Sequence, residues 1–199
     1  ALDLAPLRSL AVFHNGRVKI LDTLARETVR QITGRTTYQD AIDTPGGDAT
    51  KVSFEPLFTL LDLVIDPAFY VDRPLLHVEF LPLRRAFLDA ALPGDEPAQQ
   101  RYLMMTRITP RMAAEHYVEM VDRFGTQAPS RRGLDELDRA MALWQDSAAN
   151  MLLVAPESRD ASWHHLSEPL PPGMDAAGAQ AWQDARAAAT DLGRAWRAS

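Results

Sequence analysis

Residues 109–125, TPRMAAEHYVEMVDRFG, carry the helix pattern on which the fold class depends. Thr109 is a favourable N-terminal cap, and Pro110 suits the first helical turn because its missing N–H has no partner to lose there. Apolar side chains then recur at positions 113, 117, 120 and 124, at spacings of four, three and four residues. This spacing predicts an amphipathic helix that ends at Gly125.

Two later segments repeat the same apolar spacing. Their apolar positions are Leu134, Leu137, Met141, Trp144, Ala148 and Met151 in the first, and Trp182, Ala185, Ala189, Leu192 and Trp196 in the second. Asp175 is placed to cap the last helix. Seams of this kind joined by short connections predict antiparallel helices that cross at about 20°. We interpret the methionine and tryptophan stripes as core rather than as a ligand-binding box.

The connection between the last two helices, Pro156 to Gly173, differs from the other connections in composition and length. It holds several prolines and glycines and the cluster Trp163-His164-His165. At about 18 residues it is longer than a plain connector. We expect such a loop to carry function or to pack as a lid.

Upstream of these helices, residues 10–20 predict a short β-hairpin. Asn15-Gly16 supplies the two positive φ angles of a type I′ turn between two short runs of strand-forming residues. A two-stranded ribbon alone is marginal in water, so a support must follow it. We expect that support to be a helix over about residues 23–33, which Asp22 caps and Gly34 stops.

Residues 35–94 predict further short elements. Residues 35–53 are polar and contain Pro45-Gly46-Gly47-Asp48, which predicts an exposed loop. We expect a helix from Glu55-Pro56 to Ile65 that ends at Asp66-Pro67, a short strand at Leu75–Glu79, and a helix at Leu81–Leu92 closed by Pro93-Gly94.

Together these elements predict a mainly α protein. We expect a helical bundle with a small N-terminal β-hairpin and one further short strand. The 199 residues fit a single domain. In that domain, residues 7–94 would form the hairpin and the first helices, and residues 97–199 would form the bundle.

Composition excludes several classes of protein. Apolar residues make up 46% of the chain and charged residues 24%, which favours a folded protein over a disordered one. The net charge is −6 and no basic run is longer than Arg131-Arg132, so the electrostatic signature of nucleic-acid binding is missing. The sequence has no cysteine, which excludes disulfides, thiolate metal sites, cysteine nucleophiles and covalent haem attachment.

The sequence predicts no membrane span. The most apolar stretch, residues 58–71, is interrupted by Asp62, Asp66 and Pro67, whereas a spanning helix needs roughly 18 to 20 apolar residues. The start at Ala1 is compatible with removal of a leader or an anchor, and we identify no targeting signal.

Histidines and carboxylates give two candidate sites for a metal or haem. His116 and Glu119 are three residues apart on a predicted helix, a spacing used by carboxylate and histidine ligands in helical bundles. His164 and His165 form the second candidate, since neutral imidazole is the commonest metal ligand. Adjacent histidines in an extended loop point to opposite sides, so one of them at most faces a given site. A solvated helix face and two surface histidines beside Trp163 are the respective alternatives.

No motif of an enzyme is present in the sequence. The G-x-S-x-G signature is missing, and Gly46-Gly47 followed by Lys51 does not make a phosphate-binding loop. Paired carboxylates such as Asp135-Glu136 are typical of a wet helix face. We therefore expect no catalytic activity, and no cofactor in the isolated chain.

Residues 7–27, LRSLAVFHNGRVKILDTLARE, resemble a motif of bacterial cytochrome c biogenesis proteins of the CcsA/ResB type (system II). That motif runs approximately P-V-x-x-x-G-R-[VIL]-K-P-L-D-T-x-A-R-E and precedes a helix ending near Thr-Gly. The matching residues are Gly16, Arg17, Lys19, Leu21, Asp22, Thr23, Ala25 and Glu27. Weaker similarities follow in order at Leu60–Pro67, Arg73–Arg84 and Leu152–Pro156 with Trp163.

The resemblance implies an extracytoplasmic domain of a haem-handling membrane assembly. Two departures limit it: Ile20 stands where the family usually has proline, and the membrane spans and tryptophan-rich haem-binding segment of the synthase are missing. Haem transfer itself would then belong to partners. The chain would be either an excised periplasmic domain or a free-standing subunit.

The residues of the segment 7–27 can also be interpreted without the resemblance. Asn15 and Gly16 serve the turn, and Asp22-Thr23 serve the helix start. The remaining cations form a small group in an otherwise acidic chain: Arg17, Lys19, Arg26 and Arg30. Such a group predicts a docking surface for carboxylates, with helical ion pairs and simple solvation as the alternative.

The sequence as a whole favours a non-enzymatic, periplasmic interaction domain of a cytochrome c assembly apparatus, which binds an apocytochrome or membrane-protein subunits. Haem would enter only through those partners. One alternative is an accessory subunit on the periplasmic side of a haem- or pigment-containing membrane complex. Another is a metal-dependent enzyme that uses His116, Glu119 and one of His164 or His165.

Overall fold

The computed structural model describes residues 3–43, 49–146, 162–165, 168–170 and 173–197. The chain divides into two compact units. Unit 1 comprises residues 1–24 and 147–199, and unit 2 comprises residues 25–146.

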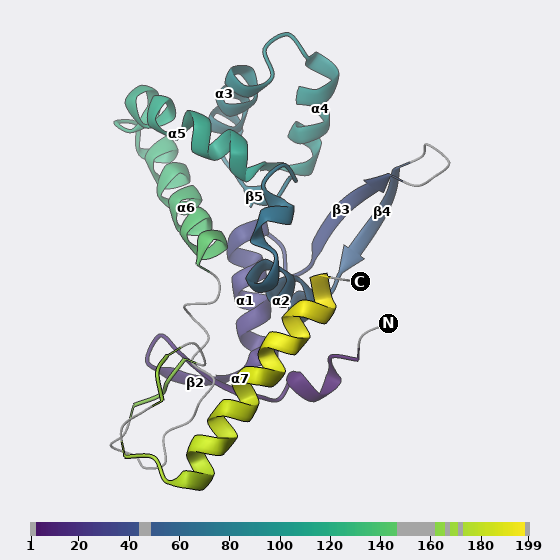
Figure 1. The fold of residues 1–199 in the computed structure, drawn as a ribbon. Coiled ribbons are helices and arrows are strands. Elements are labelled where there is room, and N and C mark those ends of the chain that lie inside the picture. The colour runs from purple at the N-terminus through teal and green to yellow at the C-terminus, as the bar shows by residue number, and fades with distance from the viewer. Residues whose placement is uncertain (1–2, 44–48, 147–161, 166–167, 171–172, 198–199) are drawn as a thin grey trace. The chain divides into compact units, whose positions relative to one another are not determined.

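The protein is mainly α-helical, as the apolar periodicity predicts (Figure 1). The described residues form seven α-helices: α1 (Leu21–Thr33), α2 (Pro56–Ile65), α3 (Leu81–Ala91), α4 (Glu96–Met105), α5 (Pro110–Phe124), α6 (Ala128–Gln145) and α7 (Ala176–Arg197). Two short 3₁₀ turns accompany them, η1 (Ala5–Leu7) and η2 (Pro67–Tyr70). Of the six apolar positions expected in the sixth helix, Ala148 and Met151 lie outside the described residues.

Six strands pair as three antiparallel ribbons within the described residues: β1 (Ala11–His14) with β2 (Arg17–Ile20), β3 (Tyr38–Asp43) with β4 (Ala49–Phe54), and β5 (Leu76–His77) with β6 (Arg107–Ile108). The N-terminal hairpin and the strand expected near residue 76 are confirmed. The strands β3, β4 and β6, and the helix α4, are additional to the prediction.

The expectation of an exposed loop over residues 35–53 is wrong, because β3 and β4 form a hairpin with six cross-strand pairs. Tyr38 lies opposite Phe54 and their rings stack with centroids 5.9 Å apart. Asp40, a charged residue, is also buried on β3 and is only 6% exposed. A buried charge within a polar run conceals the alternation by which a half-buried strand is recognised. Residues 44–48, including Pro45-Gly46-Gly47-Asp48, lie outside the described residues.

The first helix begins at Leu21, so the prediction that Asp22 caps it is wrong. Asp22 lies within the first turn. The N–H of Leu21 donates to the carbonyl of Leu10 (2.8 Å) and that of Asp22 to the carbonyl of Arg8 (3.2 Å). Because backbone carbonyls satisfy these N–H groups, the helix needs no side-chain cap at residue 22.

Three other predicted helix boundaries are confirmed. The side chain of Thr109 accepts a hydrogen bond from the N–H of Met112 (3.1 Å) at the start of α5. Asp175 accepts one from the N–H of Gly178 (2.7 Å) before α7. Gly34, with φ of +77°, follows the last residue of α1.

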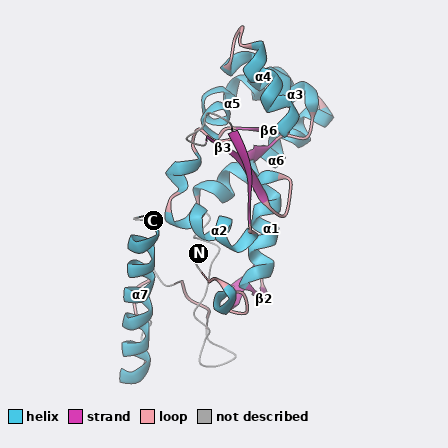
Figure 2. Ribbon diagram, turned by 90° about the vertical axis from the view of Figure 1, so that its right-hand side faces the viewer, coloured by secondary structure: helices cyan, strands magenta, loops and turns pink. Residues whose placement is uncertain are grey.

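Unit 2 has one hydrophobic core, formed mainly by α3, α5 and α6 together with β5 and β6. Figure 2 shows α3, α4 and α5 grouped at one end of this unit. The apolar positions expected to be core are buried, among them Ala113, Met120, Leu134 and Leu137. Since α7 belongs to unit 1, its packing beside α5 and α6 stays a prediction. None of the helices in the described ranges has the length and apolar character needed to cross a bilayer.

Candidate functional site

The hairpin β1–β2 of unit 1 places the residues of the N-terminal motif in a defined geometry. Asn15 and Gly16 have φ angles of +52° and +75°, the two positive values of a type I′ turn. The register that follows pairs His14 with Arg17 and Val12 with Lys19, and these alternate with two apolar pairs, Phe13 with Val18 and Ala11 with Ile20. Gly16 is required by its φ angle rather than by crowding, since a Cβ there would have no atom within 4 Å.

The two strands of this hairpin differ in exposure. On β1, Val12 is fully buried. On β2, Val18 is 60% exposed and Ile20 is 48% exposed. Val18 lies opposite Phe13 and Ile20 opposite Ala11, so these side chains share one face of the ribbon. The hairpin therefore presents apolar side chains on β2 rather than covering them.

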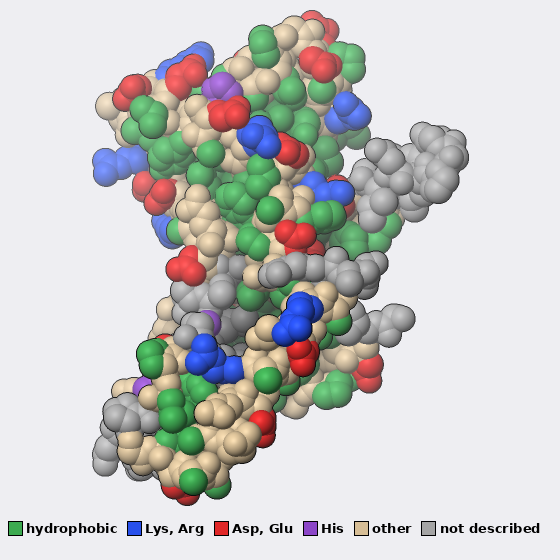
Figure 3. Space-filling model, in the orientation of Figure 1, with side chains coloured by type: hydrophobic (Ala, Val, Ile, Leu, Met, Phe, Trp, Pro, Cys, Tyr) green, Lys and Arg blue, Asp and Glu red, His purple; other side chains and the backbone are tan. Residues whose placement is uncertain are grey.

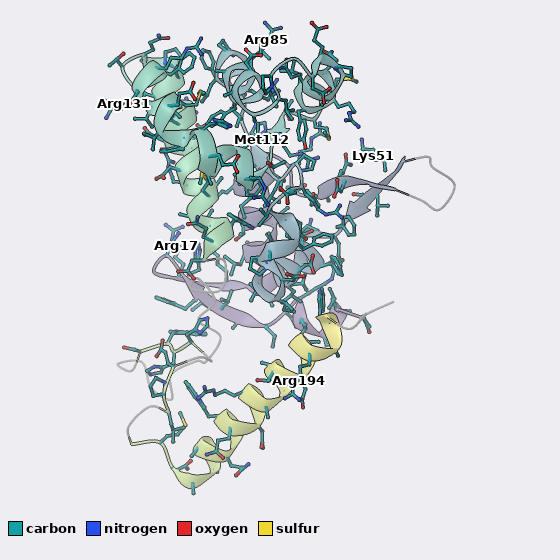
Figure 4. All side chains as sticks on the ribbon, turned by 45° about the horizontal axis from the view of Figure 1, so that its top comes forward. Arg17, Lys51, Arg85, Met112, Arg131 and Arg194 are labelled. Atoms are coloured by element: carbon teal, nitrogen blue, oxygen red, sulfur yellow. The ribbon has the colours of Figure 1, made fainter. Side chains whose placement is uncertain are left out.

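The cations of β2 lie on the other face of the ribbon. Arg17 is exposed and Lys19 is half-buried, and they alternate with Val18 and Ile20 along the strand. Arg17 follows the turn and is labelled in Figure 4. The other two cations of the predicted group, Arg26 and Arg30, are exposed on α1 and belong to unit 2.

The remaining motif residues complete the start of α1. The Asp22 carboxylate forms an ion pair with Arg8, with 3.4 Å between Nη1 and Oδ1. Thr23 is exposed in the first helical turn. Asp22 thus joins the preceding segment to the helix through its side chain, which is a structural role.

An aromatic contact brings a distant segment to β1 within unit 1. The rings of Phe13 and Trp163 stack with centroids 5.8 Å apart and an interplanar angle of 16°. Stacked rings of this kind add about 0.5–1.5 kcal/mol to the burial of their surface. The cluster Trp163-His164-His165 is therefore a neighbour of the hairpin, which no local pattern in the sequence predicts.

His164 is held by a carboxylate that the sequence pattern did not indicate. Its Nδ1 lies 2.9 Å from Oε2 of Glu168, whose other oxygen accepts from the N–H of His165 (3.1 Å). The hydrogen bonds from His164 and His165 lower the pKa of Glu168. A carboxylate on Nδ1 leaves Nε2 of the neutral ring as an acceptor, an arrangement common among metal-bound histidines. The ring of His164 also meets the edge of Trp182, with centroids 6.1 Å apart.

The other candidate metal ligands lie in unit 2. On α5, Nδ1 of His116 is 3.7 Å from Oε2 of Glu119. Within the residues that the structure describes, no three or more His, Asp or Glu side chains are grouped so that they could share a metal ion. The structure thus shows two separate pairs, His116 with Glu119 and His164 with Glu168.

Unit 2 contains a second polar cluster, at the base of the β3–β4 hairpin. Arg73 forms an ion pair with the buried Asp40. Arg107 of β6, only 8% exposed, donates to the carbonyl of Gln39 (2.6 Å), and its guanidinium lies 5.2 Å from the centre of the Tyr38 ring. A buried charge is stable only when it is paired and hydrogen-bonded. These contacts fasten β3 to β6 and to the segment after η2.

Two buried tyrosines in this cluster stay neutral across the physiological range. Burial raises the pKa of Tyr38, and the nearby Asp40 carboxylate raises it further. Burial also raises the pKa of Tyr70, whose hydroxyl donates to Asp62 at 2.6 Å. The Tyr38 hydroxyl has no hydrogen-bond partner within the described part of the chain. The charged side chains of this cluster are paired or hydrogen-bonded within the protein, which is typical of a structural role.

Charged side chains of both signs lie on the surface of unit 2. On the face of unit 2 shown in Figure 3, acidic and basic side chains are interspersed. That face carries no extended field of one sign of the kind that a phosphate backbone requires.

No protein-family model, no curated protein and no solved structure matches this chain.

Proposed function

We propose that the chain is a non-enzymatic, extracytoplasmic protein-interaction domain of a cytochrome c assembly apparatus of the system II kind. The resemblance of residues 7–27 supports the biological setting. The observation that carries the interaction role is the exposure of Val18 and Ile20, 60% and 48%, on the strand that holds part of this motif.

This observation favours binding over a purely structural role. A two-stranded ribbon gains stability by covering its apolar side chains, yet β2 leaves two β-branched residues in water. The turn fixes the register of these residues through Asn15 and Gly16. A fixed set of exposed apolar and cationic side chains is suited to recognition, because little conformational entropy is lost when a partner binds.

The partner in this proposal is an apocytochrome or a membrane subunit of the assembly apparatus. The domain would lie in the periplasm, and any haem would be bound by its partners. An accessory subunit on the periplasmic side of a haem- or pigment-containing complex would use the same hairpin. The two roles differ in what is lost when the protein is removed.

Deletion of the protein from its host separates these roles. In the proposed role, covalently bound haem in all c-type cytochromes falls, as measured by haem staining of denatured membrane proteins. In the accessory role, c-type cytochromes stay normal and one membrane complex loses its activity. Normal cytochromes together with normal complexes would reject both.

Complementation of the deletion tests the hairpin. A double variant, Val18→Asp with Ile20→Asp, is expected to fail to restore cytochrome haem, because two charges replace the exposed apolar pair. Val118→Asp is the matched control, since Val118 is 71% exposed on α5 of unit 2. Restoration by the double variant, or equal failure of both, would contradict the proposal.

A metal-dependent enzyme that uses His116, Glu119 and His164 or His165 is the competing function of another class. It is favoured by one observation, the carboxylate of Glu168 on Nδ1 of His164. Metal analysis of the purified protein tests it, and near-stoichiometric zinc, iron or manganese would support it. A haem titration with wild type and with His164→Ala plus His165→Ala tests direct haem binding by the same ring.

A further inference from the structure

The strand β2 is an open edge of its sheet. In the part of unit 1 that the structure describes, β1 and β2 form a ribbon of two strands. On strand β1 the side chain of Val12 is buried and the ring of Phe13 stacks on Trp163. Strand β2 has three exposed residues and one half-buried residue. An exposed edge strand is a template on which another strand can pair.

The register shows which backbone groups face outward on this edge. In a hairpin with a two-residue loop, the pair that flanks the turn is hydrogen-bonded, and bonded and non-bonded pairs then alternate. His14 and Arg17 flank the turn, so the next pair, Phe13 with Val18, is non-bonded. Val18 therefore directs both its N–H and its C=O away from β1.

We propose that the outer edge of β2 binds an extended segment of a partner protein as an added β-strand, and that this segment alternates apolar with acidic side chains. The backbone of Val18 supplies hydrogen bonds, and the exposed side chains of Val18 and Ile20 supply an apolar strip. Arg17, on the opposite face, attracts a carboxylate. This inference rests on the proposed interaction role and specifies how the partner is recognised.

Charge complementarity identifies the occupant as acidic. Half of the four residues of β2 are cationic, in a chain whose net charge is −6. Arg17 forms no ion pair within the residues described. An acidic side chain of an added strand would lie beside Arg17, where an opposite charge is favourable.

A second copy of the chain fits this edge poorly. If β2 of two copies paired antiparallel, either cations would lie opposite cations or each cation would lie opposite Val18 or Ile20. No register would set a carboxylate against Arg17. Like charges directly opposite each other are destabilising, so the edge disfavours self-association.

A peptide titration tests the inference on the intact chain. The probe is a seven-residue synthetic peptide that alternates valine with glutamate, and the matched control alternates valine with lysine. We expect the glutamate peptide to shift the amide resonances of Val18 and Ile20 and to slow hydrogen exchange at the Val18 N–H. Its affinity should exceed that of the lysine peptide by about tenfold. Equal affinities, no binding, or shifts confined to unit 2 would overturn the inference.

Two kinds of variant distinguish recognition through the backbone of Val18 from recognition through the charge of Arg17. Val18→Pro removes an outward N–H, which an edge strand tolerates, and should weaken binding about tenfold or more. Val18→Thr keeps the N–H and should change affinity less than about threefold. Arg17→Glu should weaken the glutamate peptide and strengthen the lysine peptide, whereas Arg131→Glu on the exposed face of α6 should do neither (Figure 4). The indole N–H resonance of Trp163, whose ring stacks on Phe13, verifies that each hairpin variant is folded.

Two other outcomes name different occupants and overturn the inference. Vesicles of phosphatidylglycerol and phosphatidylcholine at one to three would compete with the peptide and protect β2 if the edge binds a membrane. Sedimentation would show a dimer whose dissociation exposes Val18 if the edge binds a second copy. If deletion lowers cytochrome haem while Val18→Pro complements it fully, the edge inference fails and the proposed function stands.

Discussion

The hairpins β1–β2 and β3–β4 differ in the burial and pairing of their charged side chains. Strand β3 buries Asp40, pairs it with Arg73, and is held by Arg107 through the carbonyl of Gln39. Strand β2 leaves Arg17 exposed beside Val18 and Ile20. The β3–β4 ribbon is drawn projecting from the helices of unit 2 in Figure 1, and these charges fix its base.

This comparison distinguishes charged side chains that stabilise the fold from charged side chains that are available for binding. A buried charge costs several kcal/mol to desolvate and is retained only where partners compensate it. An exposed charge contributes little to stability and stays available to a ligand. Substitution of the buried charges of the β3–β4 hairpin should therefore change the free energy of unfolding, and substitution of the exposed residues of β2 should change binding.

The largest expected effect is that of Asp40→Ala. It removes the carboxylate that compensates Arg73 and the buried Arg107, so we expect the free energy of unfolding to fall by about 3 kcal/mol, measured by urea denaturation. Asp40→Asn keeps the shape and isolates the loss of charge.

Asp72→Ala is the matched control, because the Arg111–Asp72 pair is a salt bridge between exposed side chains. It should leave the urea midpoint close to that of the wild type. A loss as large as that of Asp40→Ala would show that burial does not distinguish the two pairs.

The next largest effect compares two glycines of similar conformation. Gly34 and Gly16 have φ angles of +77° and +75°. A Cβ on Gly34 would lie 2.5 Å from Cγ of His77, whereas one on Gly16 would meet nothing within 4 Å. Gly16→Ala should cost only the left-handed backbone strain, about 1 kcal/mol. Gly34→Ala should cost about 1–2 kcal/mol more, because the ring must move.

The side-chain resonances of His77 provide a second measurement for the comparison of Gly34→Ala with Gly16→Ala. Its Nδ1 lies 3.1 Å from the carbonyl of Thr106, so the ring donates there. Displacement of the ring in Gly34→Ala should break this bond and shift the His77 side-chain resonances. Equal destabilisation by the two alanines, with unchanged His77 resonances, would mean that the crowding is relieved without cost.

Local patterns in the sequence predicted most of the helices and the first hairpin. Asn15-Gly16 is a turn signal that acts over two residues, and Thr109-Pro110 acts within one helical turn. The helix α4 also has such a signal, since Asp95 caps it by accepting from the N–H of Ala98 (3.0 Å), but its weak apolar periodicity gave no support. Elements with both a local start signal and a strong apolar stripe were thus predictable.

The rest depended on contacts between distant residues. Asp40 is buried because Arg73 lies 33 positions away in sequence and beside it in space. Phe13 and Trp163 are likewise far apart in sequence, yet their rings stack. The backbone carbonyls of Arg8 and Leu10 accept hydrogen bonds from the first N–H groups of α1. The site therefore could be predicted only as a set of exposed motif residues, not as a ribbon with an exposed strand β2.

A smaller effect is expected from the phenols of the β3–β4 cluster. Tyr70→Phe loses the hydrogen bond to Asp62 and should cost about 1–2 kcal/mol. Tyr38→Phe removes a hydroxyl that has no hydrogen-bond partner among the described residues, so it should be neutral or slightly stabilising. Urea denaturation at neutral pH measures both. The opposite order would contradict the assignment of Tyr70 as the bonded phenol.

The same tyrosines predict how stability depends on pH. Burial and the hydrogen bond to Asp62 raise the pKa of Tyr70 in the folded protein, while an unfolded tyrosine ionises near pH 10. The unfolded chain therefore loses a proton that the folded chain keeps. Stability is complete below about pH 10 and falls as the pH rises above it. Tyr70→Phe should reduce this fall, and an unchanged alkaline profile would contradict the prediction.

The smallest effect is expected on β2 itself. Val18→Thr keeps the strand conformation and the backbone N–H, and its side chain is mostly in water, so the free energy of unfolding should change by less than about 0.5 kcal/mol. Val12→Thr places a hydroxyl in a fully buried position of the same ribbon and should cost about 1–3 kcal/mol. If Val18→Thr proves as costly as Val12→Thr, then β2 is covered in the folded chain by its own residues, and its edge is not available to a partner strand.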